Sequence, residues 1–326
     1  MHCIIPAAGK GTRMRPLTWS KPKPLLPVAG RPMLAHVMDT LKDAGVDHIT
    51  LITGYLGQEI VDWARSGYPD ILVDFAVQES ADGLASAVLL AEEYTTDSPS
   101  MVVLGDTLFS ADLSVLKGET RNLIVTAPVD DPSRFGVVLM ENGQVKKLVE
   151  KPSEPISNLA IVGVYYFASG RKLMEYCRQL KEKNTRTRGE YQLTDAMQLM
   201  LQNGEPFGTL NIQGWYDCGK PETLIETNRI LLKENGGAGT PVLKNSVVIE
   251  PCFFQEGTVL KNSVVGPFVS CGRNVTICDS RISDSIICDD SLVSQVNLEG
   301  SVTGDRTSVE GRPGRLFTGD DSVTCI

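Results

Sequence analysis

Basic side chains and glycines gather in one short stretch near the start of the chain. Residues 9–24 read GKGTRMRPLTWSKPKP, and they directly follow an apolar segment, residues 3–6, that predicts a strand. Glycines let backbone N–H groups come close to a ligand, and fixed arginines and lysines neutralise its negative charge. The stretch therefore predicts a polyphosphate-binding loop, for which a nucleoside triphosphate is the expected ligand.

Two common phosphate-binding motifs do not fit this loop. The dinucleotide fingerprint needs a third glycine at the position where Met14 stands. The P-loop needs Gly-Lys-Ser/Thr after a four-residue spacer, and no such run closes this one. A plain glycine-rich turn is the remaining alternative, against which the cluster of cations argues.

The loop resembles that of the sugar-nucleotidyltransferases, or nucleotide-sugar pyrophosphorylases. Their pattern Gly-x-Gly-Thr-Arg-x-Arg-Pro-Leu-Thr, then Pro-Lys-Pro, is matched within residues 9–24, and the resemblance extends over roughly residues 3–230. It implies that a hexose 1-phosphate attacks the α-phosphate of a nucleoside triphosphate in line, giving a nucleoside-diphosphate sugar and pyrophosphate. Within the family the activity of the long-form glucose-1-phosphate thymidylyltransferases is the nearest.

The resemblance assigns roles to residues of the loop. Arg13 is expected to steady the pyrophosphate, and Lys23 to reach the nucleotide phosphates and the transition state. Arg15 and Lys21 are expected at the surface or behind the residues that touch substrate. The remaining nucleotide contacts are expected at Ala8, Gly9, Gly11 and Thr12.

Two aspartates resemble the magnesium ligands of the family. Asp106 follows the apolar run 101–104, and the carboxyl end of such a strand faces the crevice where α/β sheets bind ligands. Asp217 lies in the segment Gly214–Gly219. Two carboxylates, together with phosphate oxygens and water, suit Mg²⁺. Either aspartate alone could instead be a turn or N-cap residue.

Gln78 and the turn around Gly83 are expected to select the base. An amide can both donate to and accept from a pyrimidine edge, although Gln78 could also simply face solvent at a strand end. Residues 78–85 resemble the matching stretch of thymidylyl- and uridylyltransferases, which favours dTTP and places UTP next. Pro6, where many thymidylyltransferases have leucine, leaves this preference open.

The Glu150-Lys151-Pro152 run matches the family's Glu-Lys-Pro element. The resemblance implies that Glu150 bonds sugar hydroxyls and that Lys151 holds the phosphate of the attacking substrate. Gly136 would let the backbone approach the hexose, and Arg188 would add a second phosphate contact. Glucose, galactose and amino-sugar 1-phosphates all remain open. Catalysis is expected from Arg13, Lys23, Asp106 and Lys151.

Composition narrows the class of protein. The chain has 326 residues, enough for two domains, and 31 basic against 40 acidic residues give a net charge of −9. This balance argues against general binding to nucleic acid or anionic membranes. No apolar run approaches the roughly 20 residues of a membrane span. The eight cysteines lack a Cys-x-x-Cys pair, and no secretory signal is recognisable, so a cytoplasmic protein with reduced thiols is expected.

Up to about residue 110 apolar runs alternate with helical periodicity, and residues 121–167 are richer in strands, which predicts a Rossmann-like, mostly parallel mixed sheet covered by helices. The resemblance implies that residues 1–235 form the nucleotidyltransferase domain. Leu34, Val37, Met38 and Leu41 fall on one face of a helix that Gly45 ends. Strands are expected near 3–6, 49–52, 71–73, 101–104, 123–125, 137–139, 145–149 and 161–167, and helices near 170–183, 191–203 and 221–233. Residues 236–241, rich in glycine, predict a flexible linker.

Beyond the linker, residues 242–326 predict a short parallel β-helix, with a capping coil or loose tail after residue 300. The repeat resembles the hexapeptide type, which implies a left-handed β-helix. Small apolar residues recur every six positions, which predicts one flat face per repeat and three repeats per coil. An ordinary β-rich tail is the alternative. The recurring residues are Val247, Phe253, Val259, Val265, Cys271 and Ile277, resuming at Ile287 and Val293.

Two alternative functions, acetyl transfer by the coils and a non-catalytic subunit, fit the sequence less well. Some relatives acetylate amino sugars through a histidine in the coils, but His2, His36 and His48 all precede the coils here. A regulatory or scaffold subunit would be expected to lose the basic loop or the paired aspartates. Here the basic residues Arg13 and Lys23 and the aspartates Asp106 and Asp217 are all present. The coils are therefore expected to serve assembly, as in a homo-oligomer.

Overall fold

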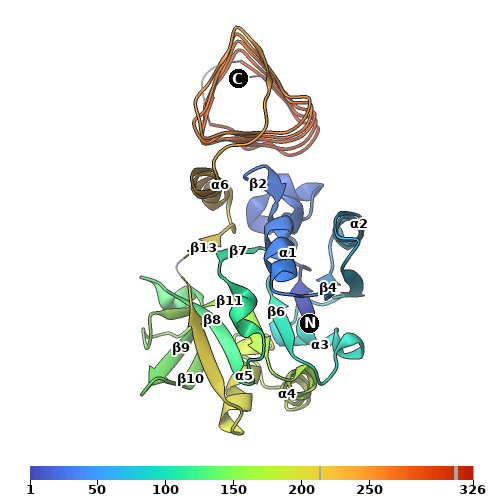
Figure 1. Ribbon diagram of the computed structural model, residues 1–326, viewed down its shortest axis with the longest axis vertical. Helices are drawn as coiled ribbons and strands as arrows, with labels where there is room; N and C mark the ends of the chain where they lie inside the picture. The colour runs from blue at the N-terminus through green and yellow to red at the C-terminus, as the bar shows by residue number, and fades with distance from the viewer. Residues whose placement is uncertain (213, 312–314, 326) are drawn as a thin grey trace. The chain divides into compact units, whose positions relative to one another are not determined.

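The computed structural model describes residues 1–212, 214–311 and 315–325, and the chain divides into two compact units (Figure 1). One comprises Met1–Gly9 and Val37–Trp215, and the other Lys10–His36 and Tyr216–Ile326. These bounds differ from the predicted boundary after residue 235. The phosphate-binding loop and helix α6 (Pro221–Asn235) group with the C-terminal coils, not with the sheet.

A nine-stranded mixed sheet is the centre of the first unit. Strand β1 (His2–Pro6) is parallel to β4 (His48–Thr53) on one side and to β6 (Ser100–Val103) on the other. Strand β5 (Leu72–Val77) extends the sheet beyond β4. Because the chain continues on one side of β1 and later returns on the other, the carboxyl end of β1 is a topological switch point, where such sheets bind ligands.

The other part of the sheet is built around β11 (Leu159–Phe167), which is antiparallel to β6, β8 and β9. The sheet is thus mixed, as predicted, although antiparallel pairs make up the part around β11. Its remaining strands are β8 (Asn122–Pro128), β9 (Gly136–Glu141), β10 (Gln144–Glu150) and β12 (Phe207–Asn211). Of these, β12 is a strand that the apolar pattern did not predict.

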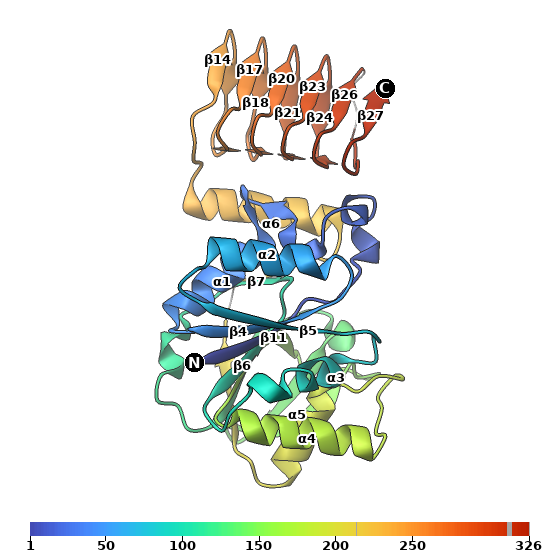
Figure 2. The same ribbon diagram turned by 90° about the vertical axis from the view of Figure 1, so that its right-hand side faces the viewer.

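Helices cover both faces of this sheet, with α2 (Gly57–Gly67) on one side and α3 (Leu84–Leu89), α4 (Gly170–Glu182) and α5 (Leu193–Gln202) on the other (Figure 2). Helix α4 shows why these segments are helical. Ser169 caps it by accepting from the Lys172 N–H, and its buried residues recur at helical spacing. Helix α1 (Met33–Asp43) buries the predicted apolar face, and the chain turns at Gly45, which has φ +85°.

The second unit contains the predicted left-handed β-helix, whose coils have a triangular cross-section (Figure 1) and stack in parallel (Figure 2). Each of its three faces is a parallel sheet. The first face consists of β14 (Val242–Lys244), β17 (Val259–Lys261), β20 (Thr276–Cys278), β23 (Leu292–Ser294), β26 (Ser308–Glu310) and β27 (Val323–Cys325). The second has β15 (Val247–Val248), β18 (Val264–Val265), β21 (Arg281–Ser283) and β24 (Asn297–Glu299). The third has β16 (Phe253–Phe254), β19 (Ser270–Cys271), β22 (Ile286–Ile287) and β25 (Val302–Thr303).

The strict six-residue spacing predicts the wrong interior residues at the start of the coils. Stacked corner residues are separated by 17 positions, as at Asn245 and Asn262, and later by 16, as at Asn274 and Asp290. These coils are therefore one or two residues shorter than three six-residue repeats. Val247 is 57% exposed, and Phe253 and Val259 are only half-buried. The residues that fill the coil interior are Phe254, Leu260, Val265, Cys271, Ile277, Ile282, Ile287 and Val293.

Substitutions at two neighbouring positions can test which residues point into the coil interior. Leu260→Ala removes a fully buried side chain and should cost about 3 kcal/mol of unfolding free energy. Val259→Ala, one residue earlier and half-buried, should cost at most about 1 kcal/mol. Chemical denaturation followed by far-UV circular dichroism measures both. Equal losses in the two variants would contradict the assigned phase.

A further difference from the predictions lies at the start of the coils. The predicted flexible linker is bonded to the first coil, since the Ala238 N–H donates to Cys252 O and Ala238 O accepts from the Phe254 N–H. Gly237 and Gly239 lie against the backbone of Cys252 and Phe254, so closely that a β-carbon would clash. After residue 300 the chain forms a further coil, as one of the two expected alternatives, since β26 pairs with β27. Residues 312–314 of the predicted tail lie outside the described part.

His2 on β1 gives the sheet a pH dependence. Its Nε2 lies 2.8 Å from Thr50 Oγ1, and its ring stacks on His48. Burial, assisted by positive charge on His48 and on the Met1 ammonium and opposed by Asp74, lowers the pKa of His2 from 6.5 to about 4. The fold thus favours neutral His2. Its contribution is complete above pH 6.5 and is lost as the pH falls towards 4.

The expected loss is up to about 3 kcal/mol of unfolding free energy. Urea denaturation at about pH 7.5 and about pH 4.5 should show it in the wild-type protein, and His2→Gln should lose less over the same interval. An equal loss in the two proteins would mean that other groups cause the acid sensitivity.

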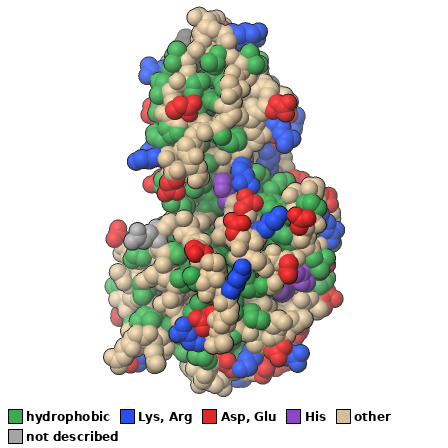
Figure 3. Space-filling view, in the orientation of Figure 1, with side chains coloured by type: hydrophobic (Ala, Val, Ile, Leu, Met, Phe, Trp, Pro, Cys, Tyr) green, Lys and Arg blue, Asp and Glu red, His purple; other side chains and the backbone are tan. Residues whose placement is uncertain are grey.

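Acidic and basic side chains are interspersed on the face shown in Figure 3, with apolar side chains in small groups between them. In the described part of the chain, no helix is both long enough and apolar enough to cross a membrane.

Candidate active site

The phosphate-binding loop belongs to the second unit, and short helical turns shape it. Gly11 has φ +59° and precedes the 3-10 helix η1 (Thr12–Met14). The Thr18 hydroxyl donates to Gly11 O at 2.8 Å, which closes the loop on itself. Met14 and Thr18 are buried beneath it, whereas Thr12 and Arg13 are exposed. The loop thus presents its glycine backbone and the guanidinium of Arg13 to solvent from a fixed base, and Arg15, over the ring of Trp19, is exposed as well.

The structure brings Arg13 and Asp217 together. Both lie against Gly219, where a β-carbon would be 3.3 Å from Arg13 Nη2 and 2.8 Å from Asp217 Oδ1. Asp217 ends strand β13 (Gly214–Asp217), and its Oδ1 accepts the Gly219 N–H at 2.9 Å. The turn therefore orients the carboxylate beside the guanidinium, and only a residue without a side chain leaves room for both.

Lys23 is held more tightly than a surface lysine. It is 8% exposed and begins the 3-10 helix η3 (Lys23–Leu25) between Pro22 and Pro24. Its Cβ lies 3.2 Å from where a β-carbon of Gly11 would be. The two prolines restrict the backbone on either side. Lys23 thus packs directly on the glycine turn that is expected to receive phosphates.

In the first unit, Asp106 and the start of the loop share the switch point of the sheet. Ala8 and Gly9 follow β1, and Ala7 N–H donates to Ile52 O. Asp106 follows β6 and is half-buried, and the Gly105 N–H next to it donates to Pro6 O at 3.2 Å. Asp106 therefore lies beyond the carboxyl ends of β1 and β6, as the sequence predicted.

Gln78 and Gly83 occupy the next positions along this edge. Gln78 directly follows β5, is half-buried, and donates its backbone N–H to Thr53 O at 2.8 Å. Gly83 has φ +117° and lies against the backbone of Tyr191, so that no side chain fits there. Gly83 therefore joins the start of α3 to the segment before α5.

The residues predicted for the sugar phosphate form one cluster. Lys151 Nζ lies 3.4 Å from Glu150 Oε1, and Arg188 Nη2 donates to Lys151 O at 2.8 Å. Lys151 and Arg188 both have positive φ, +43° and +54°. The Lys151 N–H donates to Phe135 O. The bond at Arg188 spans 37 residues of sequence, so the fold and not local chain geometry joins these two cations.

Glu150 and Gly136 lie on the wall of a cavity of about 510 Å³. The Thr194 hydroxyl donates to Glu150 Oε2 at 2.8 Å, and the Glu150 side chain is 10% exposed. A β-carbon on Gly136 would lie 3.0 Å from both Glu150 Oε2 and Thr194 Oγ1, so glycine keeps this wall open. The cavity thus combines an oriented carboxylate with a bare stretch of backbone.

Among the residues of this cavity that sequence reasoning missed are Thr194, Tyr165 and Gln192. Tyr165 belongs to the apolar run that predicted β11, and burial raises its pKa. Thr194 lies in the first turn of α5, where its spacing suggests only a helix start. None of the three belongs to a motif, so only the fold reveals them.

Magnesium would be held here by few protein groups. Within the residues that the structure describes, no three His, Cys, Asp or Glu side chains are arranged to hold a metal ion. Asp106 and Asp217 supply hard carboxylate oxygens, the donor type that Mg²⁺ prefers, and this ion commonly binds one or two carboxylates plus phosphate oxygens and water. The donor chemistry of these residues therefore fits magnesium.

Comparison with known proteins shows the family of the chain. The chain matches the Nucleotidyl transferase family over residues 2–234. It is 35% identical to the UTP–glucose-1-phosphate uridylyltransferase AglF of Haloferax volcanii over 243 residues, covering 72% of this chain and 98% of the relative. It is 32% identical to a glucose-1-phosphate thymidylyltransferase of Streptomyces antibioticus over 341 residues, covering 95% of this chain and 93% of the relative.

A crystal structure from Bacillus anthracis, of a protein assigned as a glucose-1-phosphate thymidylyltransferase in complex with a sucrose, matches with a TM-score of 0.62. It is 30% identical, and the match covers 71% of this chain and 95% of that one. This chain belongs to the nucleotidyl transferase family.

Proposed function

We propose that the protein transfers a nucleotidyl group from dTTP to glucose 1-phosphate, giving dTDP-glucose and pyrophosphate. The observation that carries this proposal is a cluster in which Lys151 pairs with Glu150 and Arg188 bonds to the Lys151 carbonyl. Of these three residues, Glu150 lines the cavity beside Gly136. A carboxylate next to two cations matches a ligand with hydroxyls at one end and a phosphate at the other. A hexose 1-phosphate is such a ligand.

On the sugar side, Glu150 would accept hydrogen bonds from hydroxyls. The bond from Thr194 holds its carboxylate in place, which lowers the cost of ordering it when the sugar binds. Lys151 and Arg188 would hold the phosphate, and they would keep one of its oxygens directed at the α-phosphorus. Positioning of this kind is the main contribution that a protein makes to phosphoryl-group chemistry.

On the nucleotide side, the backbone of Ala8, Gly9, Gly11 and Thr12 would bind phosphate oxygens. Arg13 and Lys23 would stabilise the charge that moves onto the leaving pyrophosphate. Gln78 and the turn at Gly83 would bind the pyrimidine. Asp106 and Asp217 are the proposed magnesium ligands, and the ion would supply neutralisation of the triphosphate charge. No covalent enzyme intermediate is needed, so sequential kinetics are expected.

UTP is the second candidate nucleotide. The 35% identity to a uridylyltransferase supports it, and the near full-length match to a thymidylyltransferase supports dTTP. The Gln78 amide can pair with either thymine or uracil, because the two bases present the same donor and acceptor groups on their pairing edge.

A pyrophosphate-release assay distinguishes the candidates. It would compare dTTP, UTP, ATP and GTP with glucose, galactose and N-acetylglucosamine 1-phosphates, each with and without magnesium. We expect the highest kcat/KM with dTTP and glucose 1-phosphate. A preference for UTP would replace the nucleotide but keep the reaction. Absence of pyrophosphate with every pair, despite a melting shift with nucleotide, would overturn the proposed catalysis.

A further inference from the structure

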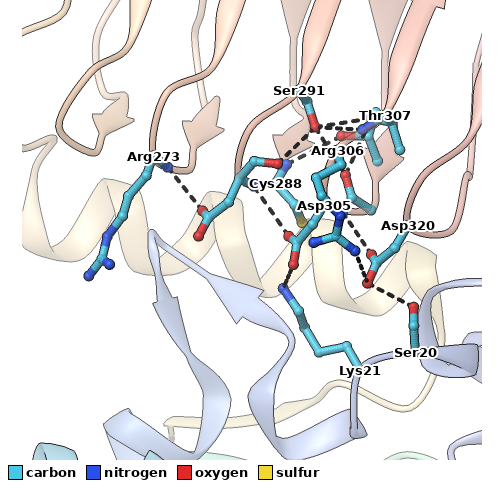
Figure 4. Close-up of polar contacts among 12 residues, drawn as sticks. Ser20, Lys21, Arg273, Cys288, Ser291, Asp305, Arg306, Thr307 and Asp320 are labelled. Atoms are coloured by element: carbon cyan, nitrogen blue, oxygen red, sulfur yellow. Dashed lines mark hydrogen bonds and ion pairs between the residues drawn. The ribbon is translucent and has the colours of Figure 1, made fainter.

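The loop that carries Arg13 and Lys23 is bonded to the last coils of the β-helix, within the second unit. Lys21 Nζ lies 2.6 Å from Asp305 Oδ2, and their side chains are 22% and 13% exposed. The Ser20 hydroxyl donates to Asp320 Oδ2 at 2.7 Å, across 300 residues of sequence. Figure 4 shows Lys21 extending from the loop towards Asp305. Lys21, expected at the surface or behind the contact residues, is thus an attachment point.

Asp305 is itself held in a ladder of aspartates at one corner of the coils. Its Oδ1 accepts the Asp289 N–H at 3.2 Å, and its own N–H donates to Asp320 Oδ1 at 2.7 Å. One coil earlier, Asp289 Oδ1 accepts the Arg273 N–H at 2.9 Å. Each carboxylate therefore ties its coil to the preceding one, and Asp305 additionally directs an oxygen at Lys21 (Figure 4).

This ion pair lines a cavity of about 450 Å³ together with Leu25, Pro27 and Cys288. The ion pair and the Ser20–Asp320 bond are not the loop's only contacts with the coils, since Gly319 also packs closely on Pro16. Burial raises the pKa of Asp305, and the Lys21 ammonium opposes this shift. Loss of Lys21 would leave a poorly solvated carboxylate, so the two charges hold each other in place.

A displacement at Lys21 would be passed on to Lys23. Only Pro22 separates the two lysines, and its backbone is fixed at φ −65°, ψ 141°. Lys23 in turn packs on Gly11, the turn that precedes Arg13. Lys23 therefore contacts Gly11 at the other end of the segment 11–23, and the neighbouring Lys21 fixes this end to Asp305 of the coils.

We propose that Asp305 is a positioning residue, through which the β-helix sets the position of Lys23 in the active site. This inference rests on the proposed function. It explains why the catalytic loop groups with the coils and not with the sheet that binds the sugar. A shift of about 1 Å in a group that stabilises the transition state can cost up to about a hundredfold in rate.

The test compares Asp305→Asn and Lys21→Met with a matched variant, Asp284→Asn. Asp284 also joins the coils to another element of this unit, since its Oδ1 accepts from Arg229 Nε of α6 at 2.7 Å, but it does not touch the loop. We expect kcat to fall about tenfold in D305N and K21M, with KM for hexose 1-phosphate unchanged. D284N should retain kcat. Lys21→Arg should retain most activity, and the double variant should be no worse than either single one.

Hydrogen exchange of residues 10–26 supplies a readout that needs no activity. Exchange there should be faster in D305N and K21M than in the wild type or D284N, at temperatures well below melting. Unchanged kcat and unchanged exchange would overturn the inference. If D305N does not fold, K21M tests the same bond with an unaltered β-helix. If the wild type has no transfer activity, the proposed function fails, while the exchange result still decides whether Asp305 holds the loop.

Discussion

Replacing Asp106 with asparagine is expected to lower kcat by about a hundredfold or more while the protein stays folded. Asp106 follows β6 at the switch point of the sheet, where the neighbouring Gly105 N–H bonds to Pro6 O. Asparagine has the same shape but no charge, so it would bind magnesium weakly. Pyrophosphate release at saturating substrates, with magnesium varied, measures both the loss of turnover and the higher magnesium requirement.

Asp112→Asn is the matched control. Asp112 is exposed, and its carboxylate accepts the Ser114 N–H at 2.9 Å at the start of the short helix Leu113–Leu116. Asparagine can still accept that bond and cap the helix, so both stability and turnover should change little. If D106N kept turnover within a few-fold of the wild type, Asp106 would not be a magnesium ligand, and another carboxylate would have to be sought.

The sheet could be predicted well from the sequence because its strands are short apolar runs between glycines and polar turns. The runs at 3–6, 49–52 and 101–104 correspond to β1, β4 and β6, and β1 lies between the other two strands in the sheet. Their order places Asp106 and the glycine loop at one end, which a general rule for parallel sheets predicts. The order of motifs along the chain likewise predicts that Glu150, Lys151 and Arg188 belong to one site, and the structure brings these residues together.

Other features depend on contacts between distant residues and have no local signal. The coil length of 17 or 16 residues follows from stacked corner residues such as Asn245 and Asn262, so a fixed period of six misplaced Val247 and Val259. The pair Lys21–Asp305 joins opposite ends of the chain. The partner of Glu150 is a helix residue, Thr194, whose spacing carries no chemical pattern.

Lys151→Met should lower kcat/KM for hexose 1-phosphate by about 10- to 100-fold and change the KM for the nucleotide little. A hydrogen bond to a charged group contributes about 1.5–3 kcal/mol, and each 1.4 kcal/mol corresponds to about tenfold. The backbone bonds at Lys151, to Phe135 O and from Arg188, do not involve its side chain and should survive the substitution. Glu150 loses its ion-pair partner as well, but the hydrogen bond from Thr194 still orients its carboxylate.

The neighbouring hairpin offers a control of the same type. Lys146→Met removes one ammonium from β10, the strand that Lys151 directly follows, but Lys146 pairs with Glu141 at 2.6 Å on the exposed surface. Steady-state kinetics with the sugar phosphate varied at saturating nucleotide should show normal kcat/KM for K146M. If K151M matched K146M, the phosphate would be held by other groups. Since Arg188 bonds to the Lys151 carbonyl, a double variant with Arg188→Met would then show whether that guanidinium alone holds it.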